Sequence, residues 1–323
     1  MKQHAKKKNF VVIGGGTGSY TVLSGLKKYP VKLSAIVTMA DEGGSTGILR
    51  DELGVLPPGD VRQCLVALSS SDLLMRELMN YRFGSGGLKG HSFGNLFLSA
   101  LEKVTGSFDL AVQRASEILR LQGYVIPATL QQTHLVAYLR NGKMVRGEDN
   151  VQKADLLRIK HIALQPKARA NPKALKAISR ADTIIIGPGD FYCSLVPNLL
   201  VQGISQAICK SRAKKIYACN LVTRARHTDA WNVKEYATQL ERYLGCSFDA
   251  IVYNNRKPGA GVFKKYARKG EQMVLAQKGL DKARFVGADL LNKGIFAPQK
   301  TDRIHRSFIR HDPDKLARLL LKI

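Results

Sequence analysis

Short apolar runs recur along the chain, and several of them end in loops of small and polar residues. The first two runs are 10–13 and 33–37, and the segment between them carries apolar residues at helical spacing. Strand, glycine loop, helix and strand make a βαβ unit, which favours a parallel sheet. Further strands are predicted at 159–164, 183–186, 215–219, 250–253 and 285–287. Helices are predicted at 61–68, 73–78, 96–101, 110–121, 173–180, 196–208, 231–244 and 315–322.

Residues 60–158 interrupt this alternation. They read mainly as helices, followed by a hairpin of 135–139 and 144–145 around the turn Asn141-Gly142. We therefore expect an α/β fold with a mainly parallel sheet in a single domain over 10–323. Residues 1–9 would form a basic tail, and 60–158 would form a helical and hairpin insertion.

Five predicted strands are followed by loops of Gly, Asn, Asp, Ser and Thr. These loops lie at 14–18, 38–47, 187–189, 220 and 254–255. In an open α/β sheet, ligands bind beyond the carboxyl ends of the strands. The sequence thus predicts that all five loops can converge on one site.

The loop of Gly14, Gly15, Gly16, Thr17 and Gly18 follows a strand and opens a helix. Glycines let backbone N–H groups approach a phosphate, and the start of a helix adds partial positive charge. The spacing is not that of a dinucleotide fingerprint, because Ser19 stands at the third glycine position. The loop also lacks the Gly-Lys-Ser/Thr of a Walker motif.

A second loop contains carboxylates, in the order Asp41, Glu42, Gly43, Gly44 and Ser45. Carboxylates beside a phosphate loop indicate Mg²⁺ or a ribose hydroxyl as partner.

The start of the helix near residue 61 carries two further charges. Asp60 is expected to cap this helix, and Arg62 stands in its first turn. A positive charge is unfavourable there, so we expect a ligand or a carboxylate to hold Arg62.

Two more loops hold candidate binding residues. His91 lies in 90–95, which opens a helix at Asn95, but it has neither a sequence-adjacent acid nor a second metal ligand. The loop from Gly187 to Gly189 leads to residues that could hold a base or a sugar, namely Tyr192, Ser194 and Asn198.

Composition adds charge but little specificity. Lys and Arg number 51 against 25 Asp and Glu, a net charge of +26, which attracts phosphates of many kinds. The basic stretches lack an aromatic platform for RNA, so a nucleic acid is not our expected partner. The longest apolar runs, such as 181–186, are too short for a membrane span. We expect a cytoplasmic protein, because 10–13 is also too short for a secretory segment.

The five cysteines are Cys64, Cys193, Cys209, Cys219 and Cys246. No two of them have C-x-x-C spacing, which argues against a zinc knuckle or a redox motif. Their odd number fits reduced, buried thiols.

Taken together, these blocks resemble the gluconeogenesis-factor (YvcK-type) proteins of the CofD-like superfamily. The resemblance covers nearly the whole chain and rests on five segments in order: VVIGGGTGSYTVLSGLK (11–27), AIVTMADEGGSTGILRDELGVLPPGDVRQCLVALS (35–69), GHSFGNLFLSAL (90–101), ADTIIIGPGDFYCSLVPNLLVQGI (181–204) and IRHD (309–312). It implies a Rossmann-like three-layer sandwich. It also implies a site for UDP-N-acetylglucosamine and a role linking carbon metabolism to cell shape and peptidoglycan precursor supply.

By the matching motifs, Thr17, the Asp41 loop, Asn198 and Arg310 carry over to the ligand site. Arg310 suits a phosphate, because a guanidinium can bind it bidentately. The wider predicted site adds the other glycines and the residues Ser45, Asn95, Tyr192, Ser194 and Asn220. One departure is Glu42, where the family usually has a second aspartate; its extra methylene would displace a metal ligand.

Three hypotheses remain open at this stage. The first is a nucleotide-sugar-binding regulator with no catalytic residue and no required cofactor. The second is a Mg²⁺-dependent transferase like 2-phospho-L-lactate transferase, with Asp41 and Asp60 as metal ligands. The third is a basic protein that binds nucleic acid or an anionic surface. The sequence does not decide whether the protein has a regulatory protein partner or forms a homodimer.

Overall fold

The computed structural model describes residues 7–294 and 309–323, and its centre is a seven-stranded sheet. The order is β10-β9-β8-β7-β1-β2-β3, and every neighbouring pair is parallel. The strands are β1 (Asn9–Gly14), β2 (Lys32–Val37), β3 (Tyr124–Pro127), β7 (Thr183–Ile186), β8 (Lys214–Ala218), β9 (Ala250–Asn254) and β10 (Phe285–Ala288). From β1 the chain first adds β2 and β3 on one side, and later adds β7 to β10 on the other side. The strand order therefore reverses between β1 and β7. The predicted parallel α/β fold is confirmed.

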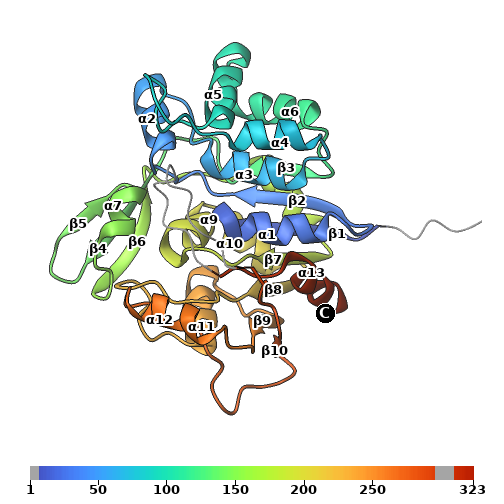
Figure 1. Cartoon of the computed structure of the whole chain (residues 1–323), viewed down its shortest axis with the longest axis vertical. Coiled ribbons are helices and arrows are strands. Elements are labelled where there is room, and N and C mark those ends of the chain that lie inside the picture. Colours follow the sequence, from blue (N-terminus) through green and yellow to red (C-terminus); the bar gives the residue numbers. More distant parts are fainter. Residues whose placement is uncertain (1–6, 295–308) are drawn as a thin grey trace, which may run out of the picture.

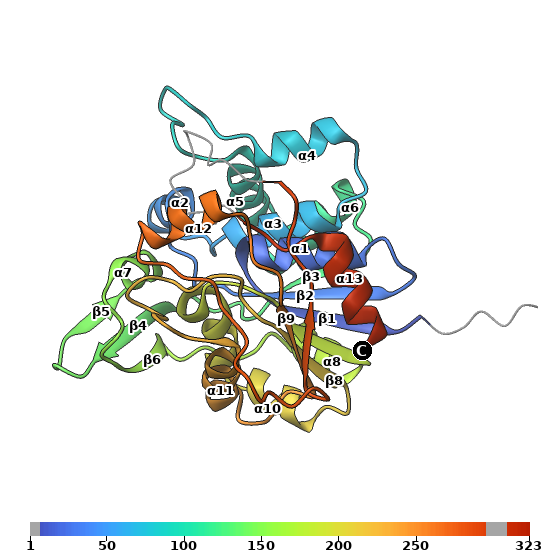
Figure 2. The same ribbon diagram turned by 60° about the horizontal axis from the view of Figure 1, so that its bottom comes forward.

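Helices cover both faces of this sheet (Figures 1 and 2). Alternate residues of β1 point to opposite layers: Phe10 and Val12 join one core cluster, and Val11 and Ile13 join the other. The first layer contains α1 (Gly16–Leu26), α3 (Gly59–Leu68), α5 (Phe93–Thr105), α6 (Phe108–Ile118) and α13 (Pro313–Lys322). The second contains α8 (Pro172–Ser179), α9 (Val196–Leu200), α10 (Ile204–Lys210) and α11 (Val233–Leu244). This is the expected three-layer sandwich.

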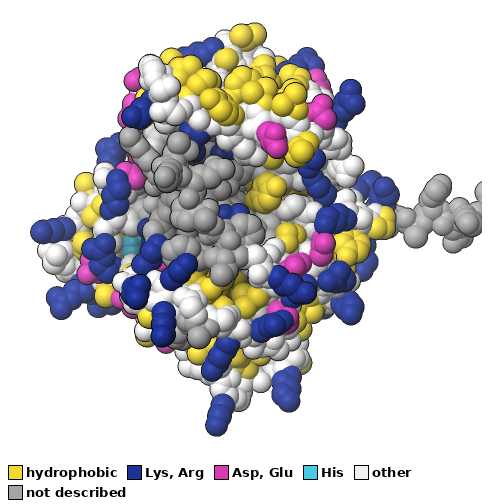
Figure 3. Space-filling view, viewed as in Figure 1, with side chains coloured by type: hydrophobic (Ala, Val, Ile, Leu, Met, Phe, Trp, Pro, Cys, Tyr) yellow, Lys and Arg dark blue, Asp and Glu magenta, His cyan; other side chains and the backbone are white. Residues whose placement is uncertain are grey.

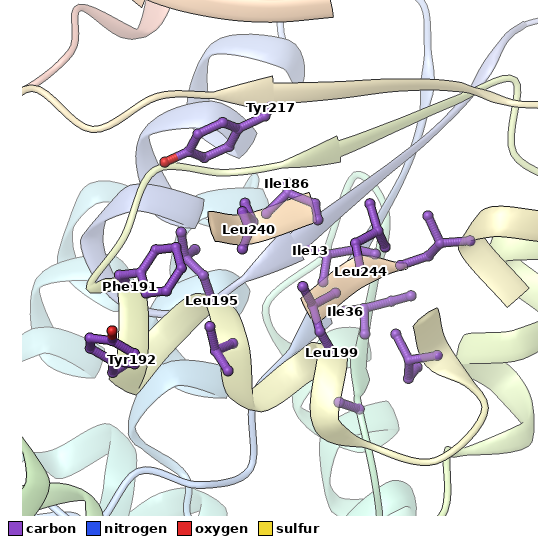
Figure 4. Close-up of a cluster of buried hydrophobic side chains, with 14 of the residues drawn as sticks. Ile13, Ile36, Ile186, Phe191, Tyr192, Leu195, Leu199, Tyr217, Leu240 and Leu244 are labelled. Atoms are coloured by element: carbon purple, nitrogen blue, oxygen red, sulfur yellow. The ribbon is translucent and has the colours of Figure 1, made fainter. Parts of the chain in front are cut away.

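The second layer holds a continuous apolar core (Figure 4). Ile13, Ile36 and Ile186 come from three neighbouring strands and are almost completely buried. Leu199 and Leu240 reach the same cluster from α9 and α11. Burial of one such side chain stabilises the folded state by roughly 1.5–3 kcal/mol. Packing in this layer therefore holds the ends of the strands, and the loops that follow them, in place.

A separate unit, which we call the hairpin module, spans residues 134–165. Its three antiparallel strands lie in the order β5-β4-β6: β4 (His134–Leu139), β5 (Met144–Arg146) and β6 (Ile159–Gln165). Helix α7 (Glu148–Lys153) follows the predicted hairpin. Between β2 and β3 lie two more helices, α2 (Ser45–Leu53) and α4 (Leu73–Asn80). Strand β3, inside the 60–158 region, belongs to the main sheet and separates the helical part from the module.

The single helix predicted over 196–208 is wrong. The structure has a π-helical turn η1 (Phe191–Leu195), then α9, then α10. The break falls where Gln202 pairs with the backbone of Ala168 and Ala170, so its N–H and C=O are used outside a helix. Gly203 follows with a φ of 101°. The sequence reading also missed α2, β3, α7 and α12 (Ala260–Ala267).

The expectation of reduced cysteines is wrong for two of the five. Cys209 in α10 and Cys246 after α11 form a disulfide, with Cα atoms 5.8 Å apart. Cys64, Cys193 and Cys219 are free and buried, as expected. The spacing of 37 residues between the bonded pair gives no local sequence signal, because α10 and α11 meet only in the folded chain.

The surface carries many basic side chains. On the face shown in Figure 3, Lys and Arg are spread around the outline, and hydrophobic side chains gather over the α4–α6 region. Within residues 7–294 and 309–323, no helix has the length and apolar character that crossing a membrane requires.

Candidate functional site

A cavity of about 490 Å³ lies beyond the carboxyl ends of the central strands. Four of the five predicted loops line it: those after β1, β2, β7 and β8. The cavity thus lies where the strand order reverses, which is the usual ligand position in such sheets. The fifth loop does not line it. Asn254 instead donates to the carbonyl of Arg256 (2.6 Å) and accepts from the N–H of Leu290 (3.1 Å), so it stabilises its own turn.

Most of the predicted site residues line this cavity. They are Gly15, Gly16, Thr17, Gly18, Asp41, Gly43, Gly44, Ser45, Asp60, Asn95, Gly189, Ser194, Asn220 and Arg310. Gly14, Gly187, Tyr192 and Asn198 are absent from its lining.

Asn198 and Tyr192 lie behind the cavity wall. The Asn198 amide is fully buried and donates to the carbonyls of Gly14 (3.4 Å) and Ser194 (2.8 Å). Tyr192 is also buried and packs edge-on against Phe191. Contrary to expectation, neither side chain lines the cavity. Asn198 stabilises the glycine loop and η1 through these two bonds, and Tyr192 is itself part of η1.

At Gly15 and Gly18 the glycine loop packs against its neighbours too closely for a side chain. A β-carbon on Gly18 would lie 1.6 Å from the carbonyl oxygen of Pro188. A β-carbon on Gly15 would lie 2.1 Å from a carboxylate oxygen of Asp60. Gly16 has a φ of 59°, which favours glycine. The glycines therefore hold the loops of three elements together, in addition to exposing backbone N–H groups.

Asp60 does not cap α3, contrary to expectation. Pro58 occupies the cap position, and Asp60 stands in the first turn. Its carboxylate instead accepts the N–H of Gly16, across the gap to α1. Desolvation, followed by the negative charge of Asp41, raises the pKa of Asp60 to about 8.

Asp41 is held by its own loop. One carboxylate oxygen accepts the N–H of Gly43 and the other accepts the hydroxyl of Thr46, both at 3.0 Å. Desolvation raises its pKa. Glu148, from α7, completes an acidic cavity floor, and its pKa is raised by burial and then by the charge of Asp41. The three carboxyl groups therefore oppose one another's ionisation.

Glu42 does not face the cavity. Its carboxylate binds Arg50 (2.8 Å) and His134 (2.6 Å) on the opposite side of the loop. The expectation that its extra methylene displaces a metal ligand is therefore wrong: the backbone turns this side chain away.

Polar side chains near α2 and α5 form a buried network. The Ser45 hydroxyl lies 3.1 Å from Nδ1 of His91 and accepts from the Asn95 amide (3.3 Å). The Asn95 carbonyl accepts from Nε of Arg62 (3.0 Å). Arg62 also donates to Asn80 (2.7 Å), and its positive charge opposes the rise that burial causes in the pKa of both Asp41 and Asp60. Amides and carboxylates therefore both surround the guanidinium. No acidic side chain in the described ranges hydrogen-bonds to His91, which leaves the Ser–His pair without a triad.

The loop after β7 is fixed from β8. Asn220 donates to the carbonyl of Gly189 (2.6 Å) and accepts from the hydroxyl of Tyr217 (3.3 Å). Asp190 accepts the N–H of Cys193 at 3.0 Å and starts η1. Asn220 thus positions the loop as well as lining the cavity.

Arg310 approaches the cavity from the C-terminal part of the chain, together with Ile309 and His311. The N–H of Ile309 donates to the hydroxyl of Tyr266 in α12 (3.0 Å). Burial lowers the pKa of His311 to about 4, so its imidazole is neutral at pH 7. His311, directly after Arg310, pairs through its backbone with Leu291, which follows β10.

Sequence reasoning missed most of the charged side chains around the cavity. Apart from Arg62, these are Arg82, Lys89, Glu148, Asp149, Lys153, Asp190, Arg224 and Glu271. They lie in the insertion, in the hairpin module, in the loops after β7 and β8, and after α12, and their place at the cavity depends on tertiary packing.

Comparison with known proteins identifies the family. Residues 10–292 match the model of the family described as 2-phospho-L-lactate transferase CofD. A relative from Nostoc is 43% identical over 315 residues, which are 97% of this chain and 68% of the relative. The protein named gluconeogenesis factor in Bacillus subtilis is 37% identical over 321 residues, 98% of each chain.

Solved structures agree with this result. A crystal structure of a protein from Bacillus halodurans has a TM-score of 0.89 and 38% sequence identity, covering 98% of this chain and 100% of that one. The chain therefore belongs to the CofD-like family, among its gluconeogenesis-factor (YvcK-type) proteins.

Proposed function

We propose that the protein binds a nucleotide sugar, UDP-N-acetylglucosamine, in this cavity and acts as a regulator without turnover. It would link carbon metabolism to cell-wall precursor supply and cell shape, through a partner protein. The observation that carries the proposal is the convergence of four helix starts on one cavity, those of α1, α2, α3 and α5. Helix N-termini and glycine loops favour phosphate groups.

The charges around the cavity suit a ligand with both phosphates and hydroxyls. Arg224, Arg310 and Lys153 line it and could balance a diphosphate. Asp41 and Glu148 on the floor could accept hydrogen bonds from ribose or sugar hydroxyls. Relatives are named for a role in gluconeogenesis, which supports a regulatory function.

The acidic floor favours one second candidate, a Mg²⁺-dependent transferase. Its ligands would be Asp41 and Asp60, as the sequence predicts. However, burial raises the pKa of both Asp41 and Asp60, which favours the neutral carboxyl group over the anion that Mg²⁺ binds. No group of three metal-binding side chains occurs among the described residues. These residues do not fit a metal site as they stand, so we derive no reaction step through one.

Nucleic-acid binding has weaker support. The basic side chains on the face in Figure 3 are dispersed and do not form one stripe. Binding through them would decrease strongly with salt.

Calorimetric titration with UDP-N-acetylglucosamine, at about 0.15 M salt with and without Mg²⁺, tests the proposal. UDP and GDP serve as comparison ligands. Saturable binding that does not need Mg²⁺ and is weaker for GDP supports the regulator. A preference for GDP that requires Mg²⁺ would transfer the support to the transferase.

A further inference from the structure

One carboxylate joins the cavity loop to the hairpin module. The first oxygen of Glu42 accepts from Arg50 of α2 at 2.8 Å and lies 2.6 Å from Nδ1 of His134, the first residue of β4. The second oxygen accepts the N–H of Glu148, the first residue of α7, at 3.2 Å. Glu42 thus contacts three elements, although His134 and Glu148 lie 92 and 106 residues further along the chain.

The two neighbouring acids, Asp41 and Glu42, point in opposite directions. Asp41 faces the cavity and fixes the turn through Gly43 and Thr46. Glu42 points the other way, and its backbone carbonyl lies so close to α2 that a β-carbon on Gly47 would be 2.3 Å from it. The position of Asp41 is therefore rigidly linked to that of Glu42.

The hairpin module contributes the side chain of Glu148 to the cavity lining. The N–H of Glu148 binds Glu42, while the Glu148 side chain lines the cavity floor. A β-carbon on Gly147 would lie 2.6 Å from the same Glu42 oxygen, so glycine is needed for this approach. Movement of the module relative to Glu42 would thus move Glu148 relative to Asp41.

The link is largely shielded from water. The Arg50 side chain is 3% exposed and that of Glu42 is 15% exposed. Arg50 also donates to the carbonyl of Thr133, directly before β4, at 2.7 Å. A shielded ion pair with a second anchor holds its geometry better than a surface pair.

We propose that Glu42 is a positioning residue that couples the cavity to the hairpin module, so that ligand affinity depends on the placement of that module. This inference rests on the proposed ligand site. Glu42 itself touches no ligand in this account. It acts through Asp41 on one side and through Glu148 on the other.

The test compares three variants by calorimetry at 25 °C with UDP-N-acetylglucosamine. Glu42→Gln keeps the shape and removes the charge, and we expect its Kd to rise about tenfold. His134→Ala removes the half-buried imidazole with its contacts to Glu42 and Arg50, but it leaves the Arg50–Glu42 ion pair, so it should fold. Its Kd should rise about threefold.

The matched control is Glu241→Gln. Glu241 is likewise partly buried, pairs with Arg284 and accepts the N–H of Phe248 at 2.7 Å. Glu241 is not among the residues that line the cavity. The Glu241→Gln variant should lose as much thermal stability as Glu42→Gln, while its Kd for UDP-N-acetylglucosamine changes less than twofold. An unchanged Kd in folded Glu42→Gln would overturn the proposal, and so would an equal change in the control.

Amide hydrogen exchange on the unliganded variants separates this proposal from the ligand assignment. Glu42→Gln and His134→Ala should both accelerate exchange at Gly43, Thr46 and Glu148. If the wild-type protein binds no UDP-N-acetylglucosamine but these amides respond, the coupling stands and the assigned ligand fails. If they do not respond, the coupling is refuted.

Discussion

A β-carbon on Gly18 would lie 1.6 Å from the carbonyl oxygen of Pro188, so the loops after β1 and β7 are in direct backbone contact. These strands are neighbours at the point where the sheet order reverses. Gly18 and Pro188 both line the cavity. Disruption of their contact should affect both folding and binding.

We predict that Gly18→Ala destabilises the protein by about 3 kcal/mol or more, because backbone must move to make room. Denaturant unfolding measures this change. Gly84→Ala is the control, since a β-carbon on Gly84 meets nothing within 4 Å and its φ is not positive. Equal stability of the two variants would contradict the loop contact.

The raised pKa of Asp60 predicts a pH dependence of stability. The folded state keeps this proton up to about pH 8, whereas the unfolded state releases it near pH 4. The folded state therefore binds more protons between these values, and the free energy of unfolding falls as pH rises through this window. Above about pH 8 the contribution of Asp60 to the free energy of unfolding decreases no further.

Asp60→Asn should remove that loss, because the neutral amide still accepts the N–H of Gly16. Relative to wild type, the variant should gain a few kcal/mol between pH 4 and pH 8, as an order of magnitude. Urea unfolding at several pH values measures the difference, which includes the easier ionisation of Asp41 and Glu148 once the charge of Asp60 is removed. A constant difference over this range would show that Asp60 ionises normally.

The disulfide predicts a thiol count. Denatured protein should show three free thiols without reductant and five after reduction, because Cys209 and Cys246 are paired. Closing a loop of this length is worth up to about 4 kcal/mol in the chain-entropy model. Cys209→Ser removes the disulfide and should lower the free energy of unfolding by up to this amount. Cys64→Ser leaves the disulfide in place, so the protein should still contain one reducible bond. Five thiols in unreduced protein would contradict the pairing.

The buried network around Ser45 predicts that loss of His91 weakens ligand binding only moderately. His91→Ala removes the 3.1 Å contact to the Ser45 hydroxyl, which lines the cavity. We expect ligand binding to weaken by about 1 kcal/mol, the usual worth of one hydrogen bond. Titration of the variant measures this. A complete loss of binding in folded His91→Ala would assign His91 a direct role instead.

Much of the fold was predictable because its strands are short apolar runs buried on both faces. Residues 10–13, 33–37 and 183–186 show this pattern, and the glycine loops mark their ends. Strand β3 escaped notice because it has four residues, starts with the exposed Tyr124 and ends in Pro127. Helix α7 has only six residues, too few for a helical period to show.

The site was predictable where residues follow a strand directly, as Thr17 and Asp41 do. It was not predictable where a side chain arrives from a distant element. Glu148 gains its place through the hairpin module, and the role of Glu42 depends on partners about 100 residues away. Asn198 was expected at the ligand because the sequence does not show that η1 separates it from the loop.

The central claim is that this cavity is the nucleotide-sugar site. It is tested most directly by titrating UDP-N-acetylglucosamine into the wild-type protein, Arg310→Ala, Thr17→Ala and Lys278→Ala. Arg310 and Thr17 line the cavity, whereas Lys278 is an exposed residue outside it. Loss of either cavity residue should weaken binding by about 1–3 kcal/mol, and Lys278→Ala should bind as wild type does. Absence of binding by the wild-type protein, or an equal loss in all three variants, would contradict the account.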